Sequence, residues 1–186
     1  MSPEERRAAI IAATRPLLYE HGPATTTRQI AEAAGIAEGT VFRAFLSKEE
    51  LFEAVLEAEF DPTAFLDDVA QIETGLPLRE RLVAYVTLLQ ARFVGLMSLM
   101  AAMGARKPPD ALANTEIRQR LQSRGLATLL ADDADRFRIS VERVTHMVRL
   151  LTFAGSHPHI SDDQPLTPEE IADVILYGAL RPGEDS

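Results

Sequence analysis

Basic and hydroxyl-bearing residues gather between residues 22 and 48, where three basic residues accompany two acidic ones. Arginine, lysine and threonine side chains bind phosphate oxygens, and small, aromatic or cationic groups on one helix face can approach base edges in a DNA groove. We expect Thr26, Thr27, Arg28 and Lys48 to hold phosphates, and Gly39, Thr40, Phe42 and Arg43 to face the groove. The predicted DNA contacts are Thr26, Thr27, Arg28, Gly39, Thr40, Phe42, Arg43 and Lys48.

Two short helices joined by a turn must position these side chains. Thr26 and Gln29 have the spacing of a capping box, which predicts a helix start at this point. Gly35 then ends the first helix, because glycine adopts the left-handed conformation at low cost. Residues 38–45 form the second helix, with Val41 and Phe45 facing inward. A helix, a glycine turn and a second short helix are typical of a helix-turn-helix.

This stretch resembles the DNA-binding signature of the TetR family of bacterial repressors, most densely from Ala8 to Leu56. Two positions depart from the family pattern: Phe42 stands where a tyrosine is common, and Ala37 stands where a serine usually caps the recognition helix. The missing cap costs about 1 kcal/mol of local helix stability. The residues that carry the resemblance are Thr26, Arg28, Ile30, Ala31, Ala34, Gly35, Gly39, Thr40, Phe45, Ser47, Lys48 and Glu49.

The composition narrows the class of protein. The 186 residues suffice for one or two domains with a buried core, and the apolar fraction of 46% is that of a soluble globular protein. The absence of cysteine excludes disulfides and thiol catalysis. The N-terminus lacks the apolar core of a signal peptide, and the longest uncharged run, residues 93–105, is too short to span a bilayer. We therefore expect a cytoplasmic protein without a membrane partner.

Charge supplies the main argument against DNA binding. The formal net charge is −9, and bulk nucleic-acid binders are basic. An interaction module of the same fold that lacks specific DNA recognition is therefore an alternative. Specific binding needs only a few correctly placed cations and helix N-termini. The slight excess of basic over acidic residues between residues 22 and 48 therefore favours a DNA-binding protein, with a modest salt dependence of binding.

The remaining pattern predicts an all-α protein of two domains. Residues 1–60 form the helix-turn-helix domain, in which Ser47, with Glu50 at capping-box distance, starts a linking helix over residues 47–60. Residues 61–186 form a helical domain for ligand binding and dimerisation. Its predicted helices cover residues 62–73, 77–103, 110–131, 141–155 and 168–180, with a charged connector at 132–139.

The long helix over residues 77–103 is apolar nearly all round, which is typical of a buried central helix. Its methionines are either plain core or the adaptable wall of an apolar pocket. The resemblance favours the pocket, because TetR-family C-terminal domains commonly hold an inducer among such helices. The predicted pocket for a small apolar effector comprises Phe65, Tyr85, Leu89, Phe93, Met97, Met100 and Met103.

The last two predicted helices have wide apolar faces. Packing within the chain is one interpretation, and the other is a homodimer in which two helices from each subunit form a four-helix bundle. TetR-like proteins are similar in this respect, so the dimer is our expectation. The predicted interface comprises Val144, Met147, Leu151, Ala154, Ile175, Leu176 and Ala179.

Catalytic and metal chemistry have weaker support. His157, His159, Asp162 and Asp163 lie in one loop and are metal-ligand types, but a coil gives them no fixed geometry, so we interpret them as a surface loop. We expect no cofactor, no metal and no catalytic residues, and a small enzyme is the least favoured alternative. The favoured function is a ligand-responsive regulator, most simply a repressor, which binds a palindromic operator.

Overall fold

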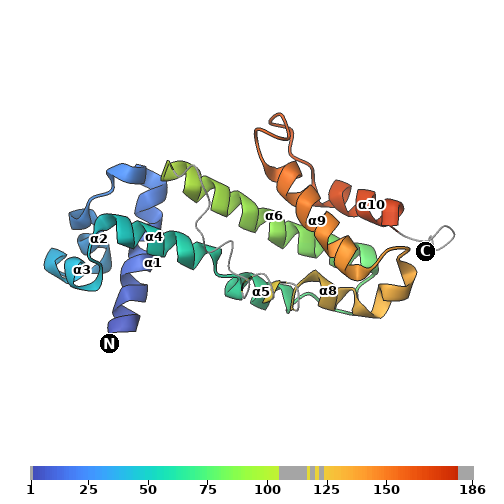
Figure 1. Ribbon diagram of the computed structural model, residues 1–186, viewed down its shortest axis with the longest axis horizontal. Coiled ribbons are helices and arrows are strands. Elements are labelled where there is room, and N and C mark those ends of the chain that lie inside the picture. The colour runs from blue at the N-terminus through green and yellow to red at the C-terminus, as the bar shows by residue number, and fades with distance from the viewer. Residues whose placement is uncertain (1, 105–116, 118–119, 122–123, 180–186) are drawn as a thin grey trace. The chain divides into compact units, whose positions relative to one another are not determined.

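The computed structural model describes residues 2–104, 117, 120–121 and 124–179, and the elements that it describes are helices (Figure 1). This confirms the predicted all-α class. Contacts between Cα atoms divide the chain into two compact units. The first contains residues 1–61 with the described part of 96–114, and the second contains 62–95 with the described part of 115–186. The predicted functional division at residue 60 stays a prediction.

The first unit consists of α1 (Pro3–His21), the 3-10 helix η1 (Gly22–Ala24), α2 (Thr27–Ala34), α3 (Glu38–Ala44), α4 (Lys48–Phe60) and the last turns of α6. Capping boxes start α1 and α2, as their sequences predict. One apolar core holds these helices together. Its buried members are Ile10, Leu18, Ile30, Ala31, Val41, Phe45, Leu51, Phe52, Val55, Leu56, Phe60, Leu96 and Leu99.

The start of α4 differs from the predicted capping box in one bond. The Ser47 hydroxyl accepts a hydrogen bond from the Glu50 amide at 3.0 Å, as expected. The Glu50 carboxylate, however, accepts from the amide of Leu46 at 2.6 Å and not from that of Ser47. Its side chain therefore reaches back into the turn that joins α3 to α4.

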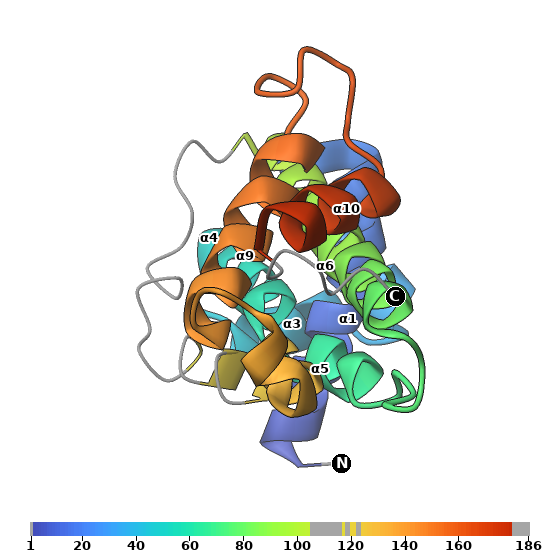
Figure 2. The ribbon, with the colours of Figure 1, turned by 90° about the vertical axis from the view of Figure 1, so that its right-hand side faces the viewer.

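The second unit contains α5 (Thr63–Val69), most of α6 (Leu78–Ala102), α8 (Leu126–Leu129), the 3-10 helix η3 (Ala131–Arg136), α9 (Val141–Ser156) and α10 (Pro168–Ala179). Helices α9 and α10 pack side by side (Figure 2). Two predictions need correction: α5 ends at Val69 and not at residue 73, and the connector at 132–139 is largely 3-10 helix. Most of the predicted helix 110–131 lies outside the described residues.

Helix α6 contributes to both cores. Leu82, Val86 and Leu89 are buried in the second unit, whereas Leu96 and Leu99 are buried in the first. The helix is long and apolar enough to cross a membrane by length and composition alone, but these positions serve the cores of the two units. The expected buried central helix is buried only in part, since Val94 is 47% exposed.

A buried ion pair fastens α6 to η3. The Arg81 guanidinium donates to the carboxylate of Asp133 and to the carbonyl of Leu129, and Arg136 donates to the other carboxylate oxygen of Asp133 at 2.8 Å. Burial alone would raise the pKa of Asp133, but the bonds from Arg81 and Arg136 outweigh it and hold that pKa below its ordinary value.

Candidate nucleic-acid interface

The turn between α2 and α3 has the backbone geometry of a helix-turn-helix. Gly35 lies in the left-handed region at φ 66° and ψ 32°. The amide of Ile36 donates to the carbonyl of Ala31 at 3.0 Å, which closes the end of α2. Helix α3 then starts at Glu38, and α2 packs against both α1 and α3.

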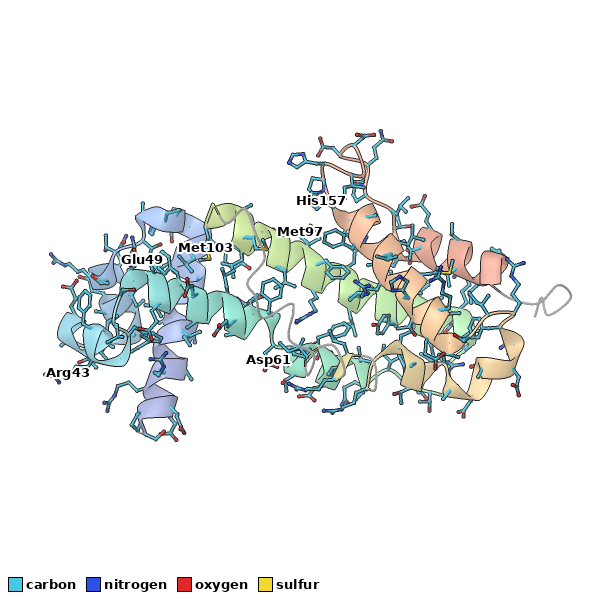
Figure 3. All side chains as sticks on the ribbon, viewed as in Figure 1. Arg43, Glu49, Asp61, Met97, Met103 and His157 are labelled. Carbon is cyan, nitrogen blue, oxygen red and sulfur yellow. The ribbon has the colours of Figure 1, made fainter. Side chains whose placement is uncertain are left out.

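Helix α3 separates into a buried face and an exposed face. Val41 and Phe45 are each 2% exposed in the core of the first unit, which confirms their predicted inward orientation. Phe42 is 51% exposed, and a Cβ atom added at Gly39 would meet no atom within 4 Å. Arg43 extends outward from α3 (Figure 3) and has no ion-pair partner in the described part of the chain. An uncommitted cation beside an exposed ring and an open glycine can approach a groove and its phosphates.

The predicted phosphate ligands at the start of α2 already have partners within the chain. The Thr26 hydroxyl caps α2 by accepting from the Gln29 amide at 3.2 Å. The Thr27 hydroxyl donates to the Glu38 carboxylate at 2.5 Å. Arg28 pairs with Glu32 at 3.3 Å, although both side chains are well exposed. These contacts are at the surface and exchange readily with a phosphate, but they place acids next to the predicted interface.

Lys48 has a structural task that the sequence did not indicate. Its ammonium group donates to the carbonyl of Pro23 at 2.8 Å and to that of Thr25 at 3.2 Å, and it lies 5.2 Å from the centre of the Phe52 ring. These contacts tie the start of α4 to the segment that precedes α2. An ammonium group has three N–H donors, so one remains for the phosphate contact that we predict.

The sequence did not indicate a role for Arg6 and Arg7, two arginines near the N-terminus. A hollow of about 270 Å³ lies between the start of α1 and α3, lined by Pro3, Arg6, Arg7, Thr40, Arg43 and Ala44. Arg6 is exposed and has no ion-pair partner in the described residues. Arg6 and Arg43 thus border the same hollow from different helices. Only the fold brings them together, because 37 positions separate them in the sequence.

The predicted effector-pocket residues are divided between the two units. Phe65, Tyr85 and Leu89 are buried in the second core, where the rings of Phe65 and Tyr85 meet edge to face at 5.8 Å. Burial raises the pKa of Tyr85 to about 12, so its phenol is neutral at physiological pH. Phe93 packs at the edge of this core and meets Phe153 at 5.4 Å.

The methionines of α6 lie at its far end. Met100 and Met103 pack against the core of the first unit, and Met97 is half-buried on the same helix (Figure 3). The plain-core interpretation therefore describes Met100 and Met103 in this structure. Whether an effector reaches any of these side chains stays a prediction.

The predicted dimer residues also fall into two groups. Val144, Ile175 and Leu176 are at most 5% exposed and belong to the core of their own chain, so they have almost no surface left for a partner. Leu151 and Ala154 are half-buried, Met147 is 40% exposed, and the side chain of Ala179 lies outside the described residues. The apolar residues that α9 and α10 expose are Met147, Leu150, Phe153, Val174 and Tyr177.

The histidine loop after α9 brings three rings together in tilted contacts. His157 lies 5.7 Å from the ring of Phe153 and 5.8 Å from that of His159. Asp162 and Asp163 both have positive φ, which gives this loop its tight turn. In the ranges that the structure describes, no three histidine, aspartate or glutamate side chains come together as a metal site.

Known proteins resemble this chain at two levels. Residues 10–55 match the family described as bacterial regulatory proteins, tetR family. An uncharacterised HTH-type transcriptional regulator, YvkB of Bacillus subtilis (strain 168), is 46% identical over 57 residues. That match covers 30% of this chain and only 29% of the relative.

Solved structures extend the likeness over nearly the whole chain. The TetR transcriptional regulator SCO0520 from Streptomyces coelicolor is 26% identical, with a TM-score of 0.54 over 95% of this chain and 99% of that one. A transcriptional regulator from Cytophaga hutchinsonii ATCC 33406 shares the fold at 21% identity, with a TM-score of 0.68 over 92% of this chain and 97% of that one. Residues 10–55 thus match the tetR family of bacterial regulatory proteins, and over most of its length the chain is similar to a solved TetR transcriptional regulator.

Proposed function

We propose that this protein is a cytoplasmic transcriptional regulator that binds a palindromic DNA operator as a homodimer and leaves it when a small apolar effector binds. The observation that carries the proposal is the exposed face of α3. Its uncommitted Arg43 and exposed Phe42 lie over a firmly buried Val41 and Phe45. A short helix held by its inner face while its outer face stays free for contact is what groove reading requires.

The local charge supports DNA as the partner despite the net charge of −9. Arg6 and Arg43 border one hollow, and both lack ion-pair partners in the described residues. Cations that pair with carboxylates must give up those partners before they bind a phosphate, whereas Arg6 and Arg43 need not. The acids Glu32 and Glu38 repel phosphates, so we expect moderate affinity with strong dependence on the operator sequence.

The dimer follows from the size of the interface. One recognition helix contacts only a few base pairs, too few to find a site in a genome, and two copies on a twofold axis double the contacts. We place the dimer interface on the exposed apolar residues of α9 and α10. This assignment replaces Val144, Ile175 and Leu176, whose side chains serve the core of their own chain.

The effector proposal rests on the second unit. Its aromatic side chains, Phe65, Tyr85 and Phe93, offer an apolar environment with one neutral hydroxyl group. Helix α6 contributes to both cores, so a ligand that displaces its first half acts on a helix that also packs in the DNA-binding unit. Such a shared element supplies the coupling that induction requires.

The proposal is tested by selecting DNA duplexes from a random pool with the purified protein. The selected sequence is then used in mobility-shift titrations. Arg43→Ala should weaken binding by about 1–3 kcal/mol, as the loss of a groove-facing cation does. Arg149→Ala, a change of an exposed arginine on α9, is the matched control and should bind as the parent does.

An interaction module without DNA recognition remains the second candidate. Glu38 beside Thr27 and Glu32 beside Arg28 are the observations that favour it, since each places an acid next to a predicted phosphate ligand. The selection separates the two functions, because a module without DNA recognition enriches no sequence.

A further inference from the structure

The recognition helix α3 has little stability of its own. It contains seven residues, and isolated helices of fewer than about 12 residues are marginal in water. Ala37 at its N-terminal end provides no side-chain hydrogen bond to the first amides. Its position must therefore be set by contacts from neighbouring helices, and its last carbonyl groups need donors from elsewhere.

Arg7 of α1 supplies those contacts at the C-terminal end of α3. One guanidinium nitrogen donates to the carbonyl of Ala44, the last residue of α3. The Cζ atom of the group lies 4.0 Å from the centre of the Phe45 ring, which is itself 2% exposed. The amide of Phe45 donates to the carbonyl of Val41 at 2.9 Å. A cation at this end also complements the negative end of the helix dipole.

Glu50 extends the same contact to α4. Its carboxylate accepts from the other terminal nitrogen of Arg7 at 3.2 Å and from the amide of Leu46 at 2.6 Å. The bond from Leu46, with help from Arg7, lowers the pKa of Glu50, so this side chain is charged at neutral pH. Arg7 and Glu50 thus link the last residue of α3, the connection between α3 and α4, and the first turn of α4.

We propose that Arg7 and Glu50 are positioning residues that set the orientation of the recognition helix, and that Arg7 is not a phosphate ligand. The inference rests on the proposed DNA-binding function. Arg7 and Glu50 are 41% and 36% exposed, and ion pairs at such exposure add little stability. Their effect should therefore appear in operator recognition more than in the melting temperature.

Arg7→Lys separates positioning from phosphate binding. Lysine keeps the positive charge but has neither the planar fork that bonds Ala44 and Glu50 together nor the flat face that stacks on Phe45. We expect operator affinity to fall about tenfold, as for one mismatched base pair, while affinity for random DNA and the salt slope stay unchanged. The matched control is Arg15→Lys, which changes another arginine of α1 that pairs with a glutamate of α4. It should change operator affinity less than threefold, because that pair involves Glu59 at the end of α4 and not the turn after α3.

Glu50→Gln gives a second and less intuitive result. Removing an acid from a DNA-binding domain raises DNA affinity when charge alone decides. Positioning predicts the opposite, a fall in operator affinity. Arg7 and Leu46 donate to different carboxylate oxygens of Glu50, and in glutamine one of those two positions is an NH2 group that cannot accept. Circular dichroism at 25 °C should show both variants folded, with helix content equal to that of the parent.

Amide hydrogen exchange tests the geometry without DNA. In Arg7→Lys the amides of residues 44–46 should exchange several-fold faster than in the parent, while those of α10 stay unchanged. The proposal is overturned when Arg7→Lys binds operator as tightly as the parent. It is also overturned when Arg7→Gln reduces the salt slope of binding by about one, to operator and to random DNA alike, as the loss of one phosphate contact would. A parent that selects no DNA sequence refutes the proposed function instead, and unchanged exchange at residues 44–46 then refutes the positioning role separately.

Discussion

Gly22→Ala is the substitution whose cost the structure specifies best. Gly22 ends α1 at φ 53° and ψ −137°, a conformation that essentially only glycine adopts. A Cβ atom there would lie less than 3.0 Å from the carbonyl oxygen of Ala102, at the end of α6. The substitution therefore strains the backbone and also forces α1 and α6 apart within the first unit.

The two costs together give the expected loss in the free energy of unfolding. A residue held in such a conformation costs about 1–3 kcal/mol, and forcing atoms into a packed contact costs about 1–3 kcal/mol more. We expect a loss of about 4 kcal/mol in the free energy of unfolding. Gly35→Ala is the matched control, because Gly35 also has positive φ but an added Cβ meets no atom within 4 Å. That control should lose about 1–2 kcal/mol, the cost of a left-handed residue alone.

Thermal unfolding followed by circular dichroism measures both variants. For a protein of this size each kcal/mol lowers the melting temperature by about 2–4 °C, so Gly22→Ala should melt about 5–10 °C below Gly35→Ala. Equal melting temperatures would refute the close approach of α1 to the end of α6.

Further changes test the remaining contacts. Asp133→Asn should cost about 3 kcal/mol at pH 7, because it leaves the buried Arg81 charge unpaired. Because folding lowers the pKa of Asp133, this stabilisation is present above the unfolded pKa near 3.8 and is lost as the pH falls through the folded pKa. The free energies of unfolding of parent and variant should therefore converge below pH 3.8. A difference between them that stays constant with pH would contradict the ion pair. Lys48→Met should lower the free energy of unfolding by about 1 kcal/mol through its bonds to two carbonyl groups, whereas a pure phosphate ligand would leave stability unchanged. Met147→Glu with Val174→Glu should give folded monomers in light scattering, and a variant that remains dimeric would place the interface elsewhere. A thermal-shift screen should find at least one apolar compound that raises the melting temperature in a concentration-dependent way, and Phe93→Trp should abolish this increase. An undiminished increase in the variant would show that the effector binds elsewhere.

Local signals were enough to predict the starts of α1 and α2. The side chains of Ser2 and Glu5, and of Thr26 and Gln29, bond across three residues, so their pattern is complete in the sequence. The left-handed turn at Gly35 is equally local. The same logic overextended α5 to residue 73, because after Ala70 the backbone continues with the turn bonds of Gln71 and Ile72, each to the third residue before it, and not with helical ones.

Contacts between distant segments could not be predicted in this way. Nothing in the spacing of Arg7 and Ala44 indicates that one caps the other, since that bond depends on how α1 packs. The residues predicted for the dimer interface also show what an apolar pattern alone does not reveal. A periodic apolar face is required both by a chain's own core and by a partner, and Val144 and Leu176 turned out to serve the core.

The operator selection tests the central claim most directly. The account predicts that the protein enriches a palindrome whose half-sites lie about 34 Å or slightly more apart, one helical turn of DNA. Two protomers should bind each duplex, and Arg43→Ala should bind that duplex about 5-fold to 150-fold more weakly. A selection that enriches no sequence above the starting pool, or Arg43→Ala protein that binds the selected duplex as tightly as the parent, would contradict it.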